Sequence, residues 1–192
     1  MDCSARAHRD AVVLIGHGAP ATDCPPELVG ELMSLEWRQR RTDDDRLVQR
    51  AEILDATIRR WPRTGANDPY KAGLERIAEA LQPLLSTALF AIGYNEFCSP
   101  SISEAIAHVV SQGASRVFVI PSMLTPGGLH SEQDIPRALE AVRQAHPGLV
   151  IEYLWPFDPE RVAGLLAAQV RDAVALRDGA TLLSGSTMAS SS

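Results

Sequence analysis

The sequence predicts an α/β fold, a flavodoxin-like parallel sheet with strand order 2-1-3-4, flanked by helices. Short apolar or β-branched segments alternate with longer segments of helical periodicity, which is typical of parallel sheets covered on both faces. Right-handed crossover connections then favour this strand order. The predicted strands span residues 11–15, 88–93, 116–121 and 149–154.

Helix signals separate these strands. Between the second and third strands, Ser101 and Glu104 predict a capping box, and Gly113 predicts the end of the helix that follows. The segment 134–136 is predicted to start a further helix, and the segment 158–160 to open the last one. Each predicted strand is therefore linked to the next by at least one helix.

The connection between the first two strands is unusually long. About 70 residues separate them, where about 30 complete a unit of strand, helix and strand. We therefore predict a helical insertion at about residues 25–69, with two extra helices. A single domain is predicted over residues 1–183, followed by a small, polar, disordered tail at 184–192.

The composition excludes several classes of function. A net charge of −6 argues against nucleic acid as a partner. No segment approaches the roughly 20 apolar residues of a membrane span, and the first residues lack the apolar core of a signal peptide. Cys3, Cys24 and Cys98 are too widely spaced for a disulfide framework or a zinc ribbon. We expect a soluble, cytoplasmic protein that binds neither nucleic acid nor membranes.

Two histidines and one glutamate follow the predicted strands. His17 follows the first strand, Glu96 the second and His130 the third. In such a sheet the carboxyl ends of the strands line the ligand crevice, and the predicted order makes these three strands neighbours. We therefore expect the three side chains to converge. Two imidazoles and one carboxylate suit Fe²⁺, Co²⁺, Ni²⁺ or Zn²⁺.

Each of these residues also has a structural interpretation. The imidazole of His17 could cap the next helix, and Glu96 could be a solvated loop carboxylate. Asp134 could fix the tautomer of His130 from one helical turn away, or it could stabilise a helix N-terminus. In the ligand-binding interpretation, the supporting residues around the cleft are Gly18, Gly127, Gly128 and Asp134.

Other candidate residues are given structural roles. His108 lies beside the apolar positions of a predicted helix, His146 precedes a helix-stopping proline, and Cys98 is expected to be a packing residue. No G-x-S-x-G elbow, Walker loop or G-x-G-x-x-G turn follows a predicted strand. The common hydrolase, nucleotide-binding and Rossmann sites are thereby disfavoured, and no nucleotide cofactor is expected.

Three segments of the chain resemble one known family. Residues 14–18, 96–102 and 119–136 are similar to the sirohydrochlorin cobaltochelatases and ferrochelatases, class II tetrapyrrole chelatases, in their short single-module form. The resemblance implies an ATP-independent lyase of cobalamin or siroheme biosynthesis that inserts Co²⁺, Fe²⁺ or Ni²⁺ into a sirohydrochlorin-like tetrapyrrole.

The same resemblance implies roles for the three converging residues. His17 and His130 would coordinate the metal and accept protons, and Glu96 would deliver the metal or relay protons. A non-catalytic protein that binds or delivers metal or tetrapyrrole would need the same ligands. The sequence leaves that alternative open.

A single α/β module supplies only one wall of a tetrapyrrole cleft. We therefore expect a homodimer, or a lid formed by the insertion. Substrates of this type carry several carboxylates, so a lid would bind them through arginines. A solvated helical surface is the alternative. The arginines considered are Arg38, Arg40, Arg41, Arg59, Arg60 and Arg63.

Overall fold

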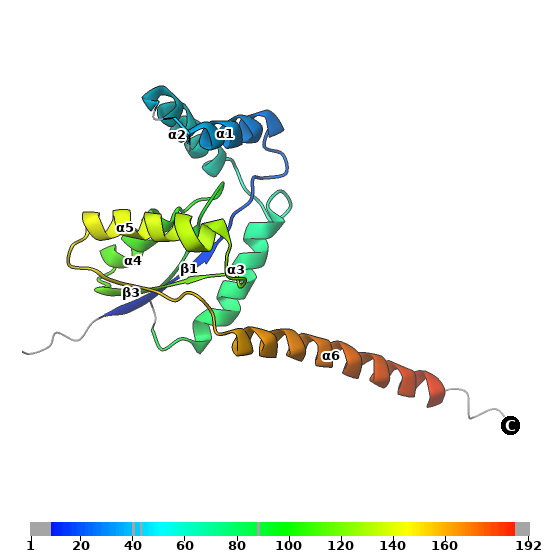
Figure 1. Cartoon of the computed structure of the whole chain (residues 1–192). Coiled ribbons are helices and arrows are strands. Elements are labelled where there is room, and N and C mark those ends of the chain that lie inside the picture. The colour runs from blue at the N-terminus through cyan, green and yellow to red at the C-terminus, as the bar shows by residue number, and fades with distance from the viewer. Residues whose placement is uncertain (1–8, 40, 43, 88, 187–192) are drawn as a thin grey trace, which may run out of the picture. The chain divides into compact units, whose positions relative to one another are not determined.

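The computed structural model describes residues 9–39, 41–42, 44–87 and 89–186 (Figure 1). The chain divides into two compact units, Met1–Trp155 and Pro156–Ser192. The sheet, the helical insertion and all three candidate ligands belong to the first unit. The prediction of a single domain over 1–183 stays a prediction.

The first unit is built on a four-stranded parallel sheet with the order β2-β1-β3-β4, which confirms the predicted fold class. In register, Ile15 pairs with Gly93 on one side and Pro121 on the other, so these three strands end at one edge. The strands are β1 (Asp10–Gly16), β2 (Leu89–Tyr94), β3 (Arg116–Pro121) and β4 (Val150–Tyr153).

Helices α4 (Ile102–Ser111) and α5 (Ile135–Ala145) cover one face of this sheet (Figure 1). The predicted capping box of α4 is present in full, with Ser101 and Glu104 each bonding the other's backbone N–H. Val117 and Val119 of β3 are fully buried in the core on this side. Helix α5 is preceded by a short π-helical segment, His130–Asp134.

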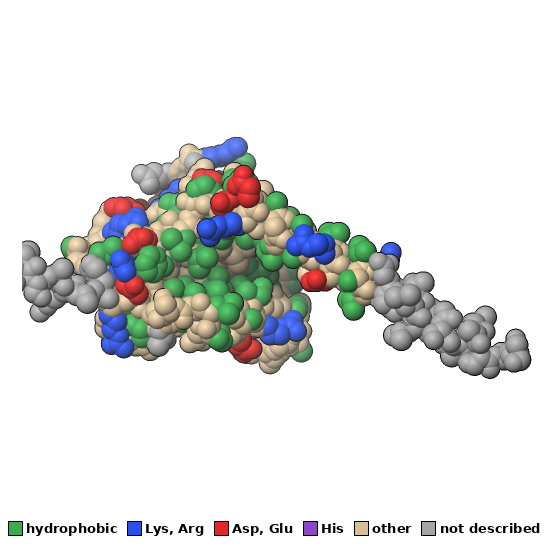
Figure 2. Space-filling view, turned by 90° about the horizontal axis from the view of Figure 1, so that it is seen from below, with side chains coloured by type: hydrophobic (Ala, Val, Ile, Leu, Met, Phe, Trp, Pro, Cys, Tyr) green, Lys and Arg blue, Asp and Glu red, His purple; other side chains and the backbone are tan. Residues whose placement is uncertain are grey.

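The opposite face of the sheet is covered less completely by helices. Helix α3 (Pro69–Leu81) packs there through Leu74 and Ala78, and a short 3₁₀ helix, Gln82–Leu84, follows it. Phe118 and Ile120 of β3 point to this side and are half-buried. In Figure 2, which views the molecule from the side away from α4 and α5, apolar side chains gather in a hollow and no histidine is visible. The candidate histidines therefore do not lie on the side of the molecule that Figure 2 shows.

The insertion forms two helices, as predicted: α1 (Pro26–Gln39) and α2 (Asp45–Arg59). They pack on each other as a helical hairpin, which lies apart from α3 and from the layer formed by α4 and α5 (Figure 1). Leu32 and Ile58 lie in the hairpin's own apolar core, and Phe97 inserts into that core from the loop after β2. The hairpin is therefore attached to the rest of the unit at that loop.

The second unit contains helix α6 (Pro159–Ser186), whose predicted start at 158–160 is confirmed. The helix contains six alanines and five leucines, which are strong helix formers. The disordered tail predicted for 184–192 stays a prediction, and 187–192 lie outside the described residues. Among the helices that the structure describes, none combines the length and apolar character needed to cross a membrane.

Candidate metal centre

The structure brings the three predicted ligand residues together at the carboxyl edge of the sheet. Nε2 of His17 lies 3.0 Å from Nε2 of His130. The Glu96 carboxylate lies 4.0 Å from His17 Nε2 and 3.5 Å from His130 Nδ1. One ligand atom from each residue fits within 4.8 Å of the others, the spacing of a metal site. The side chains are 27–37% exposed, so an ion can reach them.

Gly18 allows the loops after β1 and β2 to meet. It adopts φ +91°, and a Cβ there would lie 1.8 Å from the Glu96 carbonyl oxygen. The backbone N–H of Glu96 donates to the carbonyl of His17 at 2.8 Å. The two candidate ligands are thus linked through their backbones, and glycine is required because any side chain would push them apart.

The hydrogen bonds around the imidazoles fix their tautomers. Nδ1 of His17 lies 2.7 Å from the Gly18 carbonyl, and Nδ1 of His130 lies 2.8 Å from Asp134 Oδ2. Both oxygens only accept, so both Nδ1 atoms carry the proton. The Asn95 amide, 3.0 Å from the same His130 Nδ1, is compatible when its oxygen faces that N–H.

These tautomers leave an electron pair on each Nε2. Two acceptors 3.0 Å apart repel each other unless a cation lies between or beside them. A proton on one ring satisfies the pair, and so does a metal ion bound by both nitrogens. The site is therefore arranged to bind a cation, and the Glu96 carboxylate adds a negative charge beside it.

Asp134 lies where the sequence predicted it. It accepts from His130 one helical turn earlier and is 19% exposed. Gly127 has φ +88° with open space around it, and a Cβ on Gly128 would meet only the Thr125 carbonyl, at 3.9 Å. These two glycines shape an exposed loop and contact none of the three ligand residues.

A cavity of about 690 Å³ adjoins the centre. Glu96 and Asp134 lie on its lining, between the hairpin and the helices of the sheet layer. The hairpin wall includes Glu36, Gln39 and Asp55, and the opposite wall includes Ser103, Arg137 and Ala141. The insertion thus forms one side of the cleft that leads to the candidate ligands.

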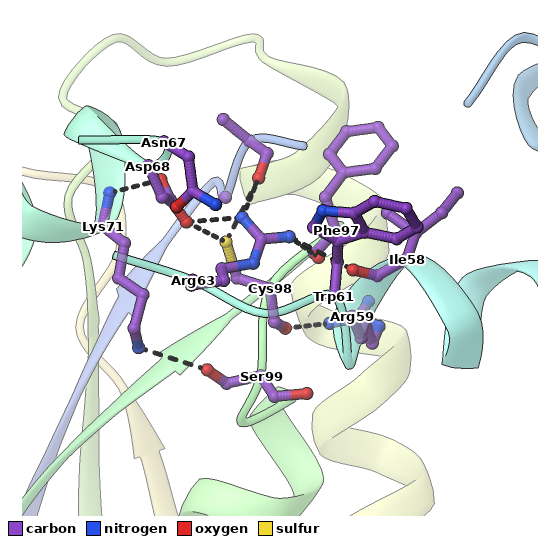
Figure 3. Close-up of polar contacts among 12 residues, drawn as sticks. Ile58, Arg59, Trp61, Arg63, Asn67, Asp68, Lys71, Phe97, Cys98 and Ser99 are labelled. Atoms are coloured by element: carbon purple, nitrogen blue, oxygen red, sulfur yellow. Dashed lines mark hydrogen bonds and ion pairs between the residues drawn. The ribbon is translucent and has the colours of Figure 1, made fainter. Parts of the chain in front are cut away.

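Two of the arginines assigned to substrate binding contact other parts of the protein. Arg59 donates to the carbonyls of Asn95 and Cys98, both at 2.7 Å, and to Asp55. Arg63 donates to Asp68 and to the Phe97 carbonyl (Figure 3). Their donors are used inside the protein, while Arg59 also lies on the lining of the cavity, so the predicted contact of these two arginines with substrate stays a prediction.

The other arginines of the insertion keep the predicted surface position. Arg38, Arg41 and Arg60 are exposed. The Arg41 guanidinium stacks on the exposed Trp37 ring, 3.9 Å from its centre. Arg40 lies outside the described residues.

Sequence reasoning missed several contacts to the centre. The hydroxyl of Tyr70, on α3, accepts from the backbone N–H of His17 at 2.7 Å. Asn95 was not singled out, although it precedes Glu96. No local pattern marks Tyr70, because its contact joins residues 53 apart in the sequence. For Asn95, the available signal was its position next to a candidate ligand, Glu96.

The residues expected to be structural lie away from the centre. His108 is exposed on α4 and contacts Gln112, and His146 ends α5. Cys98 is fully buried, which raises the pKa of its thiol through desolvation. Its Sγ donates to the Ala19 carbonyl at 3.3 Å, so it packs under the site, as predicted.

The fold and the site together define a flavodoxin-like α/β protein in which two histidines and one glutamate lie close enough together to hold a metal ion. A family model described as CbiX matches residues 64–173, more than half of the chain. The chain therefore belongs to the CbiX family. Glu96 and His130 fall inside the matched range, and His17 precedes it.

Known relatives agree with this assignment. The sirohydrochlorin cobaltochelatase of Methanocaldococcus jannaschii is 35% identical over 83 residues, 43% of this chain and 57% of that protein. The sirohydrochlorin ferrochelatase of Priestia megaterium is 28% identical over 78 residues, 40% of this chain and 29% of that protein. The chain spans about half the length of the curated relatives it matches.

A solved structure supports the fold. The CbiX protein of cobalamin biosynthesis from Marinobacter aquaeolei VT8 superposes with a TM-score of 0.53 at 19% identity, covering 88% of this chain and 98% of that one. At this identity the likeness concerns the fold alone. It agrees with the predicted fold class, and the family resemblance itself is confirmed by the family model.

Proposed function

We propose that this protein inserts a divalent metal into a sirohydrochlorin-like tetrapyrrole without a nucleotide. The observation that carries the proposal is that the Nε2 atoms of His17 and His130 lie 3.0 Å apart, with the Glu96 carboxylate beside them. Co²⁺ and Fe²⁺ are favoured by the names of the relatives, cobaltochelatases and a ferrochelatase, and Ni²⁺ suits the same ligands.

The proposed reaction exchanges one metal ion for two protons. His17 and His130 bind the incoming ion through Nε2, and the ring nitrogens of the tetrapyrrole replace these ligands stepwise. The two pyrrole protons leave as the metal enters. Each imidazole that releases the metal is then free to accept a proton, and Glu96, on the cavity wall, passes protons toward solvent.

The cavity beside the centre is the proposed site for the macrocycle. Its lining includes Arg137, whose side chain is 77% exposed and lies 3.7 Å from Asp134 Oδ1, so a substrate carboxylate can reach it. We assign the exposed Arg38 and Arg41 of the hairpin to the outer part of the same carboxylate-binding surface. Charge-assisted hydrogen bonds from guanidinium groups suit such substrates.

The proposal includes a homodimer in the cytoplasm. An open cleft between the hairpin and the sheet layer encloses a flat macrocycle on two sides, and a second copy would cover more of it. The buried Cys24 and Cys98 thiols are free, which suits a reducing compartment. Light scattering at working concentration measures the oligomeric state, and an active monomer would contradict the dimer.

An absorbance assay tests the proposed activity. Purified protein is mixed with sirohydrochlorin and Co²⁺, Fe²⁺ or Ni²⁺, and the spectral change of metallation is compared with the uncatalysed rate. Multiple turnovers above that rate support an enzyme. Stoichiometric binding of metal or tetrapyrrole without turnover would instead identify a binding or delivery protein that uses the same cleft.

A further inference from the structure

We propose that Arg59 and Arg63, both supplied by the helical insertion, are positioning residues that hold Glu96 against His17 and His130. The inference rests on the proposed function, because the position of Glu96 matters only if the centre binds a metal. Neither arginine contacts the three candidate ligands' side chains. Both act on the backbone of the loop that carries Glu96, residues 94–100 (Figure 3).

The two guanidinium groups bind most of the carbonyls of this loop. Arg59 donates to three of them and Arg63 to a fourth, at distances of 2.5–3.4 Å. Hydrogen bonds from a charged donor are stronger than neutral ones, and the planar fork fixes direction as well as distance. The accepting carbonyls are those of Tyr94, Asn95, Phe97 and Cys98.

The loop adopts a conformation that it would not keep on its own. Phe97 has φ 58°, in the left-handed region that a bulky residue rarely occupies. The N–H of Cys98 bonds the Glu96 carbonyl at 2.6 Å, which closes a tight turn around Phe97. Such a turn persists only when its surroundings impose it. The insertion imposes this turn in two ways: the Phe97 ring lies in the core of the hairpin, and Arg63, which follows the hairpin, donates to the Phe97 carbonyl.

Arg63 also ties the Glu96 loop to the His17 loop. One of its amino groups donates to the Ala19 carbonyl at 2.7 Å and to Asp68, while the other reaches Phe97. The Arg63 and Asp68 side chains are only 9% and 1% exposed. A buried ion pair contributes little net stability but fixes geometry. This pair joins the chain two residues after His17 to the chain one residue after Glu96.

The test is the affinity of the full chain for Co²⁺ alone, followed by the visible absorption of the bound ion. Arg59→Met keeps an unbranched apolar stem but removes the donors, and Arg59 lies at the helix end, outside the most buried pair. We expect affinity to fall about 10-fold or more, as for other residues that orient a ligand. Arg60→Met, at the neighbouring exposed position, is the matched control and should bind like wild type.

A double-mutant cycle separates positioning from general damage. If Arg59 acts through Glu96, then Arg59→Met lowers affinity in the wild-type background but changes it less than about 2-fold in the Glu96→Gln background. A general structural effect lowers affinity equally in both backgrounds. Equal losses would overturn the inference, as would wild-type affinity and an unchanged Co²⁺ spectrum in Arg59→Met.

Failure of the proposed function would look different. If wild type binds no Co²⁺, the proposed metal centre is wrong, whatever the arginines do. Amide hydrogen exchange in the metal-free protein then decides the inference without any ion. Faster exchange at Glu96 and Cys98 in Arg59→Met than in Arg60→Met supports it, and equal exchange overturns it.

Discussion

The loop that carries Glu96 and the loop that leads to His130 are held in place by different means. Residues 94–100 are buried or half-buried, and their carbonyls are bound by Arg59, at the end of α2, and by Arg63, which follows that helix. Residues 125–129 are exposed, and His130 is held by Asp134 on the following turn. One candidate ligand therefore depends on the insertion and the other on its own helix.

This difference separates two requirements of a metal site. A carboxylate on an irregular loop is not held by helix or sheet hydrogen bonds, so a distant scaffold must restrict its position. An imidazole at the start of a helix needs only a neighbouring acceptor to fix its tautomer and orientation. Variants that disturb one loop and spare the other test whether both requirements exist.

The largest effect is expected from the imidazoles themselves. His130→Ala removes one of the two facing Nε2 atoms, and we expect at least a 100-fold loss of Co²⁺ affinity and of chelatase activity. His17→Ala should behave in the same way. Because His130 is partly exposed and lies at the start of its helical segment, the fold should survive its replacement. His108→Ala is the control, and a His130→Ala variant with wild-type metal insertion would contradict the assigned role.

A smaller but still large effect should follow from Gly18→Ala. The new Cβ would lie 1.8 Å from the Glu96 carbonyl oxygen, so the Glu96 loop must move. We expect Co²⁺ affinity to fall about 10-fold to 100-fold, by analogy with the loss of groups that orient a metal ligand.

Gly127→Ala is the matched control for Gly18→Ala. Both glycines have positive φ, +88° and +91°, but the space around Gly127 is open. Strain from the left-handed conformation, about 1–2 kcal/mol, should therefore lower the melting temperature of both variants. Only Gly18→Ala should lose metal affinity as well, and equal affinity in the two variants would show that the close approach to Glu96 is unimportant.

Asp134→Asn tests the local support of the other loop. An asparagine keeps the shape of the side chain but can place an N–H donor where the His130 Nδ1–H needs an acceptor, so the tautomer is less strongly fixed. We expect about a 10-fold loss of Co²⁺ affinity in a titration. Glu132→Gln, on the same π-helical segment, should have little effect. Similar losses in both variants would point to charge near the site instead of tautomer control.

The two loops also show what the sequence can and cannot predict. Helical spacing alone placed Asp134 one turn from His130, and the apolar segments placed His17, Glu96 and His130 at one edge of the sheet. These inferences rest on local periodicity and on the rules of parallel sheets. The strand bounds agreed to within a residue at each end, because β-branched and apolar residues fill the strands.

The support of the Glu96 loop could not be predicted in this way. The contact of Arg59 with the Cys98 carbonyl joins residues 39 apart, and that of Arg63 with the Phe97 carbonyl joins residues 34 apart. Such contacts depend on how the hairpin packs against the loop, which no local pattern encodes. In the sequence, the same arginines were indistinguishable from the exposed Arg38 and Arg41, so all were assigned to substrate.

The smallest expected effect concerns the helices that follow the two loops. Helix α4 begins with a capping box in which hydrogen bonds from Ser101 lower the pKa of Glu104, whereas Asp134, at the start of α5, binds His130 and caps nothing. Because the pKa of Glu104 is lower in the folded protein, the ionised carboxylate stabilises the fold at pH values above its ordinary pKa of 4.5. This contribution is lost as pH falls through the folded-state pKa.

Glu104→Gln keeps the hydrogen-bond acceptor and removes the charge, so we expect a melting temperature about 2 °C lower at pH 7, with the difference vanishing at acidic pH. A Glu104→Gln difference that stays constant with pH would mean that the cap stabilises α4 through shape and not through charge.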